Sequence, residues 1–168
     1  MCLCGFINAQ SSGIWLDVPF VHQEKNGCGA AAIAMVLEYW QKQQPHPQQA
    51  VVEPSEIQRR LVSRQAHGIY ASDMQTYFEE HGFRAFAFKG DWEMLRSHLQ
   101  KGRPLIAALK PARGETSLHY VVIAGLDWDN NLVLLNDPAQ KKLLKVERGS
   151  FEKEWQAVER WTLLAVPK

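Results

Sequence analysis

The chain has 168 residues, of which 46% are hydrophobic and 22% charged, and its formal net charge at pH 7 is +1. This length predicts one domain, and the composition is that of an ordinary globular protein. The near-neutral charge and the scattered lysines and arginines argue against nucleic acid as a partner. No run approaches the roughly 20 apolar residues that span a bilayer, so we expect no stable membrane insertion within the chain.

The three cysteines Cys2, Cys4 and Cys28 leave at least one thiol free and exclude a disulfide framework. Residues 1–13 are expected to be a flexible N-terminus or the remnant of a secretory signal peptide. A remnant would place the protein in the cell envelope or outside the cell, and otherwise it would be cytoplasmic. Residues 14–168 are predicted to form the single domain. The histidines lack metal-ligand spacing, so we expect neither a metal nor another cofactor.

Helices dominate the first half of the predicted domain. After an extended segment at 14–21, an Ala-rich apolar run predicts a buried helix over 29–40. Helices are also predicted from Pro54 to about residue 65, from Ser72 to Gly82, and from Asp91 through residue 99. The period-two alternation of residues 83–88 predicts a strand between the last two helices.

Strands dominate the second half. Apolar runs at 104–109, 119–126, 131–135, 143–146 and 161–166 predict them, with a short helix around 150–155. The turn-rich residues 127–131 make 119–126 and 131–135 a hairpin. Helices followed by antiparallel strands predict an α+β fold, with a cleft where the two halves meet.

Cys28 stands where its thiol would be activated. At the start of a helix, unpaired N–H groups and the helix dipole favour a thiolate. Gly27 and Gly29 would let a substrate carbonyl approach the backbone closely, so both are predicted to bind substrate. The Cys28 N–H and the amide of Gln23 are candidate donors to an oxyanion. From position alone, a buried structural cysteine is an equally good interpretation.

His119 opens the first strand of the predicted hairpin, and Asp137 follows the second. Hairpin pairing brings these two positions together, which would give a base oriented by a carboxylate beside a nucleophile. Each residue has a simpler interpretation by itself. His119 could belong to a cross-strand polar pair, and Asp137 could form a turn with Pro138.

Three blocks of sequence, taken together, resemble the C39-like (bacteriocin-processing) papain-like cysteine peptidases. They are LDVPFVHQ with GCGAAAIAMVL (16–23 and 27–37), HYVVIAG (119–125) and NDPA (136–139). The resemblance implies a papain-like fold, in which a helix carrying the nucleophile packs on a C-terminal antiparallel sheet. It also implies Cys28 as nucleophile, His119 as general base and then acid, Asp137 as the residue that orients the imidazole, and Gln23 as an oxyanion-hole donor.

The resemblance implies hydrolysis of peptide bonds in a peptide or protein substrate, with cleavage of leader peptides after small residues such as Gly-Gly, and association with an export system. Two features depart from the transporter-linked members. Gly27 stands where they usually carry Asp, and the domain is expected to be free-standing. The alternatives are an acyltransferase that uses the same residues and a non-catalytic peptide-binding module. The oligomeric state is left open.

Overall fold

The computed structural model describes residues 13–44, 53–111 and 118–168. The predicted N-terminal region therefore lies outside the described residues, except for Gly13. That residue begins strand β1 (Gly13–Trp15), which pairs antiparallel with residues 125–127 of a central strand. A side chain at Gly125 would collide with the carbonyl of Ile14, so this glycine permits the close approach of β1.

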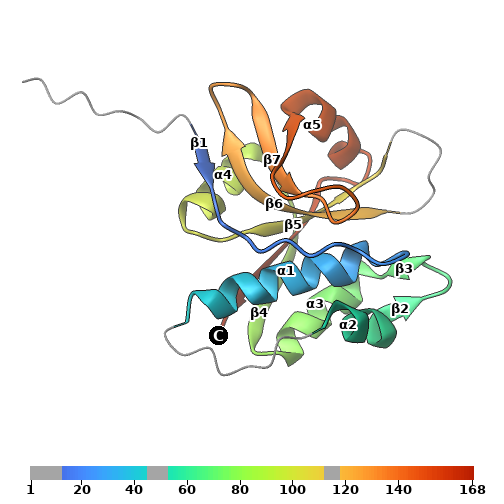
Figure 1. The fold of residues 1–168 in the computed structure, drawn as a ribbon. Coiled ribbons are helices and arrows are strands. Elements are labelled where there is room, and N and C mark those ends of the chain that lie inside the picture. Colours follow the sequence, from blue (N-terminus) through green and yellow to red (C-terminus); the bar gives the residue numbers. More distant parts are fainter. Residues whose placement is uncertain (1–12, 45–52, 112–117) are drawn as a thin grey trace, which may run out of the picture.

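Three helices lie together on one side of the molecule (Figure 1): α1 (Cys28–Lys42), α2 (Pro54–Leu61) and α3 (Ala71–Glu80). Helix α1 confirms the long helix predicted from its Ala-rich sequence. Helix α2 ends four residues before the predicted residue 65, because Val62 adopts an extended backbone. There β2 (Val62–Ser63) pairs with β3 (Gly68–Ile69), a hairpin that was not predicted. Two-residue strands are too short to give an alternating pattern.

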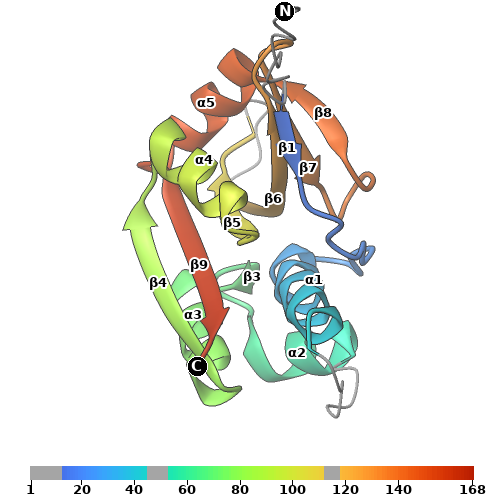
Figure 2. The same ribbon diagram turned by 90° about the vertical axis from the view of Figure 1, so that its left-hand side faces the viewer.

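The large sheet has seven strands. Beside β1, its members in spatial order are β4 (Phe83–Lys89), β9 (Trp161–Pro167), β5 (Leu105–Leu109), β6 (His119–Asp127), β7 (Leu132–Asn136) and β8 (Leu144–Glu147). All neighbouring strands are antiparallel. The two halves are less separate along the chain than expected, because β1 and β4 come from the helical half. Figure 2 shows β4 and β9 extending beside α3.

Helices cover both faces of the sheet, which explains why its central strand β6 is apolar without interruption. Alternate residues such as Val122 and Ala124 belong to the core shared with α1, α2 and α3. The intervening Val121 and Ile123 belong to a second core, under α4 (Trp92–Gln100) and α5 (Arg148–Gln156). The helix predicted from Asp91 is α4, and Asp91 caps it: its carboxylate accepts a hydrogen bond of 2.8 Å from the N–H of Met94.

The β6–β7 hairpin has the predicted turn. The carboxylate of Asp127 accepts a hydrogen bond of 3.1 Å from the N–H of Asn130. The strand register pairs Val122 with Asn136, so the beginning of β6 and the end of β7 lie at the same edge of the sheet. The beginning of α1 lies at this edge too, because its first residue, Cys28, contacts the carbonyl of Leu118 just before β6.

The core under α1 gives a direct test of this packing. Met35 is fully buried, so Met35→Ala should lower the free energy of unfolding by about 3 kcal/mol through loss of apolar contact and creation of a cavity. Denaturant titration measures the change. Lys42→Ala, at an exposed position in the same helix, is the control and should change stability by less than about 0.5 kcal/mol. Equal effects of the two substitutions would contradict this packing.

Candidate active site

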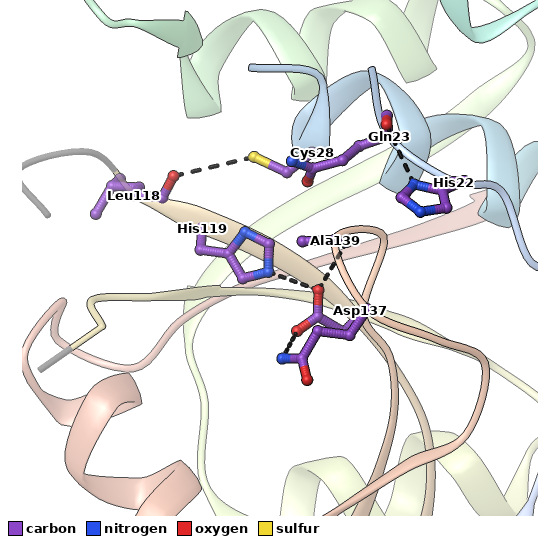
Figure 3. A network of polar contacts seen from close by, with 8 residues as sticks. His22, Gln23, Cys28, Leu118, His119, Asp137 and Ala139 are labelled. Carbon is purple, nitrogen blue, oxygen red and sulfur yellow. Dashed lines mark hydrogen bonds and ion pairs between the residues drawn. The ribbon is translucent and has the colours of Figure 1, made fainter. Parts of the chain in front are cut away.

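Cys28 is the first residue of α1, and its thiol is free and half-buried. Gly27 precedes it as the N-cap, so no side chain accepts a hydrogen bond from the first turn, and that turn contains no acidic residue. The N–H groups at this helix end remain available to an anion, and the helix dipole adds positive potential there. The Cys28 Sγ lies 4.0 Å from the carbonyl oxygen of Leu118, the residue before His119 (Figure 3).

Both glycines beside Cys28 are buried. A Cβ on Gly29 would lie 3.1 Å from the Cβ of Ile69, so its lack of a side chain lets α1 pack against β3. A Cβ on Gly27 would lie 2.7 Å from the side-chain oxygen of Gln58 in α2. These contacts give both glycines a packing role, and their predicted contact with substrate stays a prediction.

His119 and Asp137 lie together, as the hairpin register predicted. The His119 Nε2 and the Asp137 Oδ1 are 2.8 Å apart, and both side chains are largely buried. With Nε2 directed at the carboxylate, the other ring nitrogen, Nδ1, faces the side of Cys28 (Figure 3). In this orientation Nε2–H donates to the carboxylate, and Nδ1 is the nitrogen that can take up or release a proton on the side of Cys28.

The Asp137 carboxylate is held by more than the histidine. Its Oδ1 also accepts a hydrogen bond from the N–H of Ala139 (2.9 Å), and its Oδ2 accepts one from the Gln140 amide (2.7 Å). Burial favours the protonated acid, but these bonds and the charge of His119 outweigh it and lower the pKa of Asp137 below its usual value. The carboxylate therefore stays ionised. Gln140 was not predicted as a site residue. The sequence indicates only that it lies in the turn after Asp137.

The surroundings of His119 favour its charged form. Burial lowers the pKa of the ring, but hydrogen bonds and charge interactions with Asp137 and Cys28 outweigh burial and raise it to about 10. Asp137 on one side of the ring and Cys28 on the other therefore favour the imidazolium. A cysteine beside such a ring can pass its proton to the ring and exist as a thiolate.

Gln23 approaches the same place from the segment before α1, and its side chain extends toward Cys28 (Figure 3). The backbone N–H of Gln23 donates to the carbonyl of Pro138, 2.9 Å away, which ties this segment to the loop of Asp137. The side-chain oxygen of Gln23 is buried and has no hydrogen-bond partner in the described part of the chain. Within the described residues, no hydrogen bond to its oxygen therefore fixes the Gln23 side chain.

Asn136 joins the segment of Gln23 to the end of β7. This fully buried side chain donates to the carbonyls of Val18 (3.1 Å) and Pro19 (3.2 Å), and its oxygen accepts from the N–H of Leu143 (3.0 Å). The Asn136 side chain therefore links the segment that carries Gln23 to the end of β7, next to Asp137. The sequence places Asn136 beside Asp137 but gives no indication of this role, since the carbonyls to which it donates lie more than 100 residues away.

The described residues contain no group of three or more His, Cys, Asp or Glu side chains arranged to hold a metal ion. In the same part of the chain, no helix is long and apolar enough to cross a membrane.

The chain belongs to the Peptidase C39 like family, whose model matches residues 15–162. No curated protein matches the sequence. Among solved structures it is similar to a double glycine motif protease from an AMS/PCAT transporter in complex with the leader peptide (24% identity, TM-score 0.66, covering 92% of this chain and 94% of that chain). A C39-like peptidase from Bacillus anthracis is also similar (18% identity, TM-score 0.71, covering 93% and 98%).

A further similar structure is the peptidase domain of Streptococcus ComA, a bifunctional ABC transporter in a quorum-sensing pathway (20% identity, TM-score 0.68, covering 90% of this chain and 98% of that chain). The helices and the antiparallel sheet described above thus form the papain-like fold of C39 peptidase domains, which confirms the predicted α+β class and the family resemblance.

The role of Asn136 in joining the two segments can be tested by truncation. Asn136→Ala should lower the free energy of unfolding by about 3 kcal/mol, because three buried backbone groups lose their partner. Asn130→Ala, which removes exposed hydrogen bonds in the β6–β7 turn, is the control and should cost under about 1 kcal/mol. Denaturant unfolding followed by fluorescence compares the two. A cost for Asn136→Ala no larger than the control would argue against this role.

The raised pKa of His119 predicts a pH dependence of stability. Because the pKa is about 10 in the folded protein and about 6.5 in an unfolded chain, the charged ring stabilises the fold fully below about pH 6.5, and this stabilisation is lost as pH rises toward 10. Unfolding free energies measured across this range should fall more for the native protein than for His119→Gln.

Titration by NMR checks the same pair directly. The His119 ring should keep its proton well above pH 6.5, and Asp137→Asn should lower its pKa, because the carboxylate charge is removed. His98 is an internal control, since burial and then the charges of Arg103 and Lys101 lower its pKa. A His119 ring that titrates near 6.5 in both proteins would show that the pair does not hold the proton.

Proposed function

We propose that the chain is a cysteine peptidase that hydrolyses peptide bonds with Cys28 as nucleophile. One observation carries the proposal: a half-buried free thiol stands at the uncapped beginning of α1, facing a histidine whose other nitrogen is bound to a buried carboxylate. A nucleophile, a base and a residue that orients the base are the minimum set for acyl transfer through a covalent intermediate. Membership of the Peptidase C39 like family supports the same chemistry.

In the proposed reaction, the Nδ1 of His119 accepts the thiol proton while Nε2–H stays hydrogen-bonded to Asp137. The Cys28 thiolate then attacks the carbonyl carbon of the scissile peptide bond. Negative charge forms on the carbonyl oxygen, where the backbone N–H of Cys28 and the amide of Gln23 would donate hydrogen bonds. His119 next transfers its proton to the leaving amine, the C–N bond breaks, and water hydrolyses the thioester with His119 again acting as base.

Asp137 would act in this scheme by fixing the ring. Its carboxylate holds Nε2 at 2.8 Å, so the ring presents Nδ1 to the thiol in the protonation state that the first step needs. Ala139 and Gln140 would support it by keeping that carboxylate ionised and oriented. Gln140 is therefore proposed as a positioning residue.

The proposed substrate is a peptide or protein with small residues before the scissile bond, and Gly-Gly is the first sequence to test. This choice follows the similar double glycine motif protease, which was solved in complex with its leader peptide. Association with an export system stays a prediction.

The reactivity of Cys28 provides the first test. In a background with Cys2→Ser and Cys4→Ser, a thiol-alkylating reagent should label native Cys28 well below the pH at which an ordinary thiol ionises, with a pKa of about 8.5. His119→Ala should remove this reactivity at low pH, because the imidazolium no longer stabilises the thiolate. A Cys28 that is inert, or that titrates like a free thiol in both proteins, would favour the non-catalytic peptide-binding module.

Hydrolysis of a quenched peptide that contains Gly-Gly tests the roles of individual residues. Cys28→Ala should abolish turnover, and Gln23→Ala should lower kcat by about 100-fold, the loss typical of one oxyanion-hole donor. Gln44→Ala, at an exposed position after α1, is the matched control and should leave kcat unchanged. Product analysis with and without an added amine would detect an acyltransferase, and a kcat insensitive to Gln23→Ala would remove that residue from the proposal.

A further inference from the structure

A cavity of about 470 Å3 opens beside the His119–Asp137 pair, on the sheet face that α5 covers. Its lining includes Gln23 and His119 of the site, and Ser150 and Glu154 of α5. Five apolar side chains contributed by β5, β7, β8 and α5 line it between them: Leu109, Leu135, Leu144, Val146 and Phe151. The cavity therefore joins the catalytic pair to a largely apolar lining that holds one further carboxylate, that of Glu154.

Its position identifies which part of a substrate would enter it. In the proposed reaction His119 delivers a proton to the leaving nitrogen, so that nitrogen must lie against the imidazole. The Cα of the first residue of the leaving segment is bonded directly to this nitrogen. His119 lines the cavity and Cys28 does not, so the cavity lies on the imidazole side of the site, next to the leaving nitrogen and the side chain of that residue.

The residues that line the cavity determine which kind of substrate side chain it can bind. The apolar residues favour aliphatic groups, because burying apolar surface away from water is favourable. The Glu154 carboxylate is half-buried and forms no ion pair or hydrogen bond with any other described residue. The other acid of the lining, Asp137, is already paired with His119. Among the described residues of the lining, Glu154 is therefore the one acid free to attract a cation.

We propose that this cavity binds the side chain of the first residue after the scissile bond, and that it selects lysine or arginine there. Their aliphatic stems would lie along the apolar lining while the charged end reaches Glu154. An acidic side chain would be rejected by Glu154, and an uncharged aliphatic chain would gain only the apolar part. The proposal depends on the proposed peptidase function, since that reaction defines the leaving side.

The first experiment uses peptides that contain Gly-Gly followed by lysine, norleucine or glutamate and are otherwise identical. Norleucine keeps the aliphatic stem of lysine but lacks the charge, so the lysine-to-norleucine ratio of kcat/KM isolates the contribution of Glu154. We expect lysine to exceed norleucine by about fivefold, and glutamate by more than about tenfold. The same series at the second leaving residue should show little discrimination.

Variants of Glu154 complete the test. Glu154→Gln should bring the lysine-to-norleucine ratio close to one, and Glu154→Lys should reverse the order of the lysine and glutamate peptides. Glu93→Gln, an exposed glutamate on α4, is the matched control and should leave both ratios unchanged. If the native protein hydrolyses all three peptides with equal kcat/KM, or if Glu154→Gln leaves the ratios intact, the cavity proposal is overturned while the peptidase function stands.

A second measurement does not depend on catalysis. Short amides of the leaving segment, Lys-Ala-Ala, norleucine-Ala-Ala and Glu-Ala-Ala with free amino termini, are titrated by NMR into Cys28→Ser protein. The lysine peptide should bind tightest and lose that advantage in Glu154→Gln. If this order appears but the native protein cleaves none of the Gly-Gly peptides, the cavity is a recognition site for lysine and the peptidase function fails. Equal binding of the three peptides, or no binding at millimolar concentration, overturns the cavity proposal.

Discussion

The hydrogen bond between His119 and Asp137 is the constraint on which the rest of the site depends. It spans 2.8 Å between the first residue of β6 and the residue that follows β7, so it exists only in one register of that hairpin. A one-residue slip would turn His119 to the opposite face of the sheet, toward the core under α1. The turn at Asp127 and the buried alternation of β6 fix this register, and they thereby fix the ring that faces Cys28.

On the nucleophile side of the site, individual hydrogen bonds hold the chain in place of strand pairing. The segment before α1 has no regular structure between β1 and Cys28, yet it must carry Gln23 to the sheet edge. The buried amide of Asn136 and the backbone bond from Gln23 to Pro138 replace a strand ladder there. Residues distant in sequence are thus positioned by a few short-range bonds, which are directional and are strengthened by burial.

Several elements could be predicted because local chemistry decided them. Helix α1 follows from an Ala-rich run without an interior Pro or Gly, and the β6–β7 hairpin follows from two apolar runs around a turn. The β2–β3 hairpin and the pairing of β1 with β6 could not be predicted. Two- and three-residue strands carry no periodic signal, and their partners are chosen by packing. Asn136 and Gln140 look like ordinary turn residues in the sequence, where nothing shows that their side chains would bind the carbonyls of residues 18 and 19 and the Asp137 carboxylate.

The sequence by itself determined which chemical groups this protein has and in what order they occur: a cysteine opening an apolar helix, a histidine opening a strand, and an Asn-Asp-Pro turn after the next strand. The two strands are consecutive in the chain and pair through a short turn. The sequence therefore already implied that His119 and Asp137 lie next to each other. Only the tertiary structure decided that Gln23 and Cys28 meet this pair, and that α5 sets Glu154 beside an apolar cavity bordering it. Contacts between segments this far apart depend on how helices and sheet pack together, and no local pattern encodes that packing.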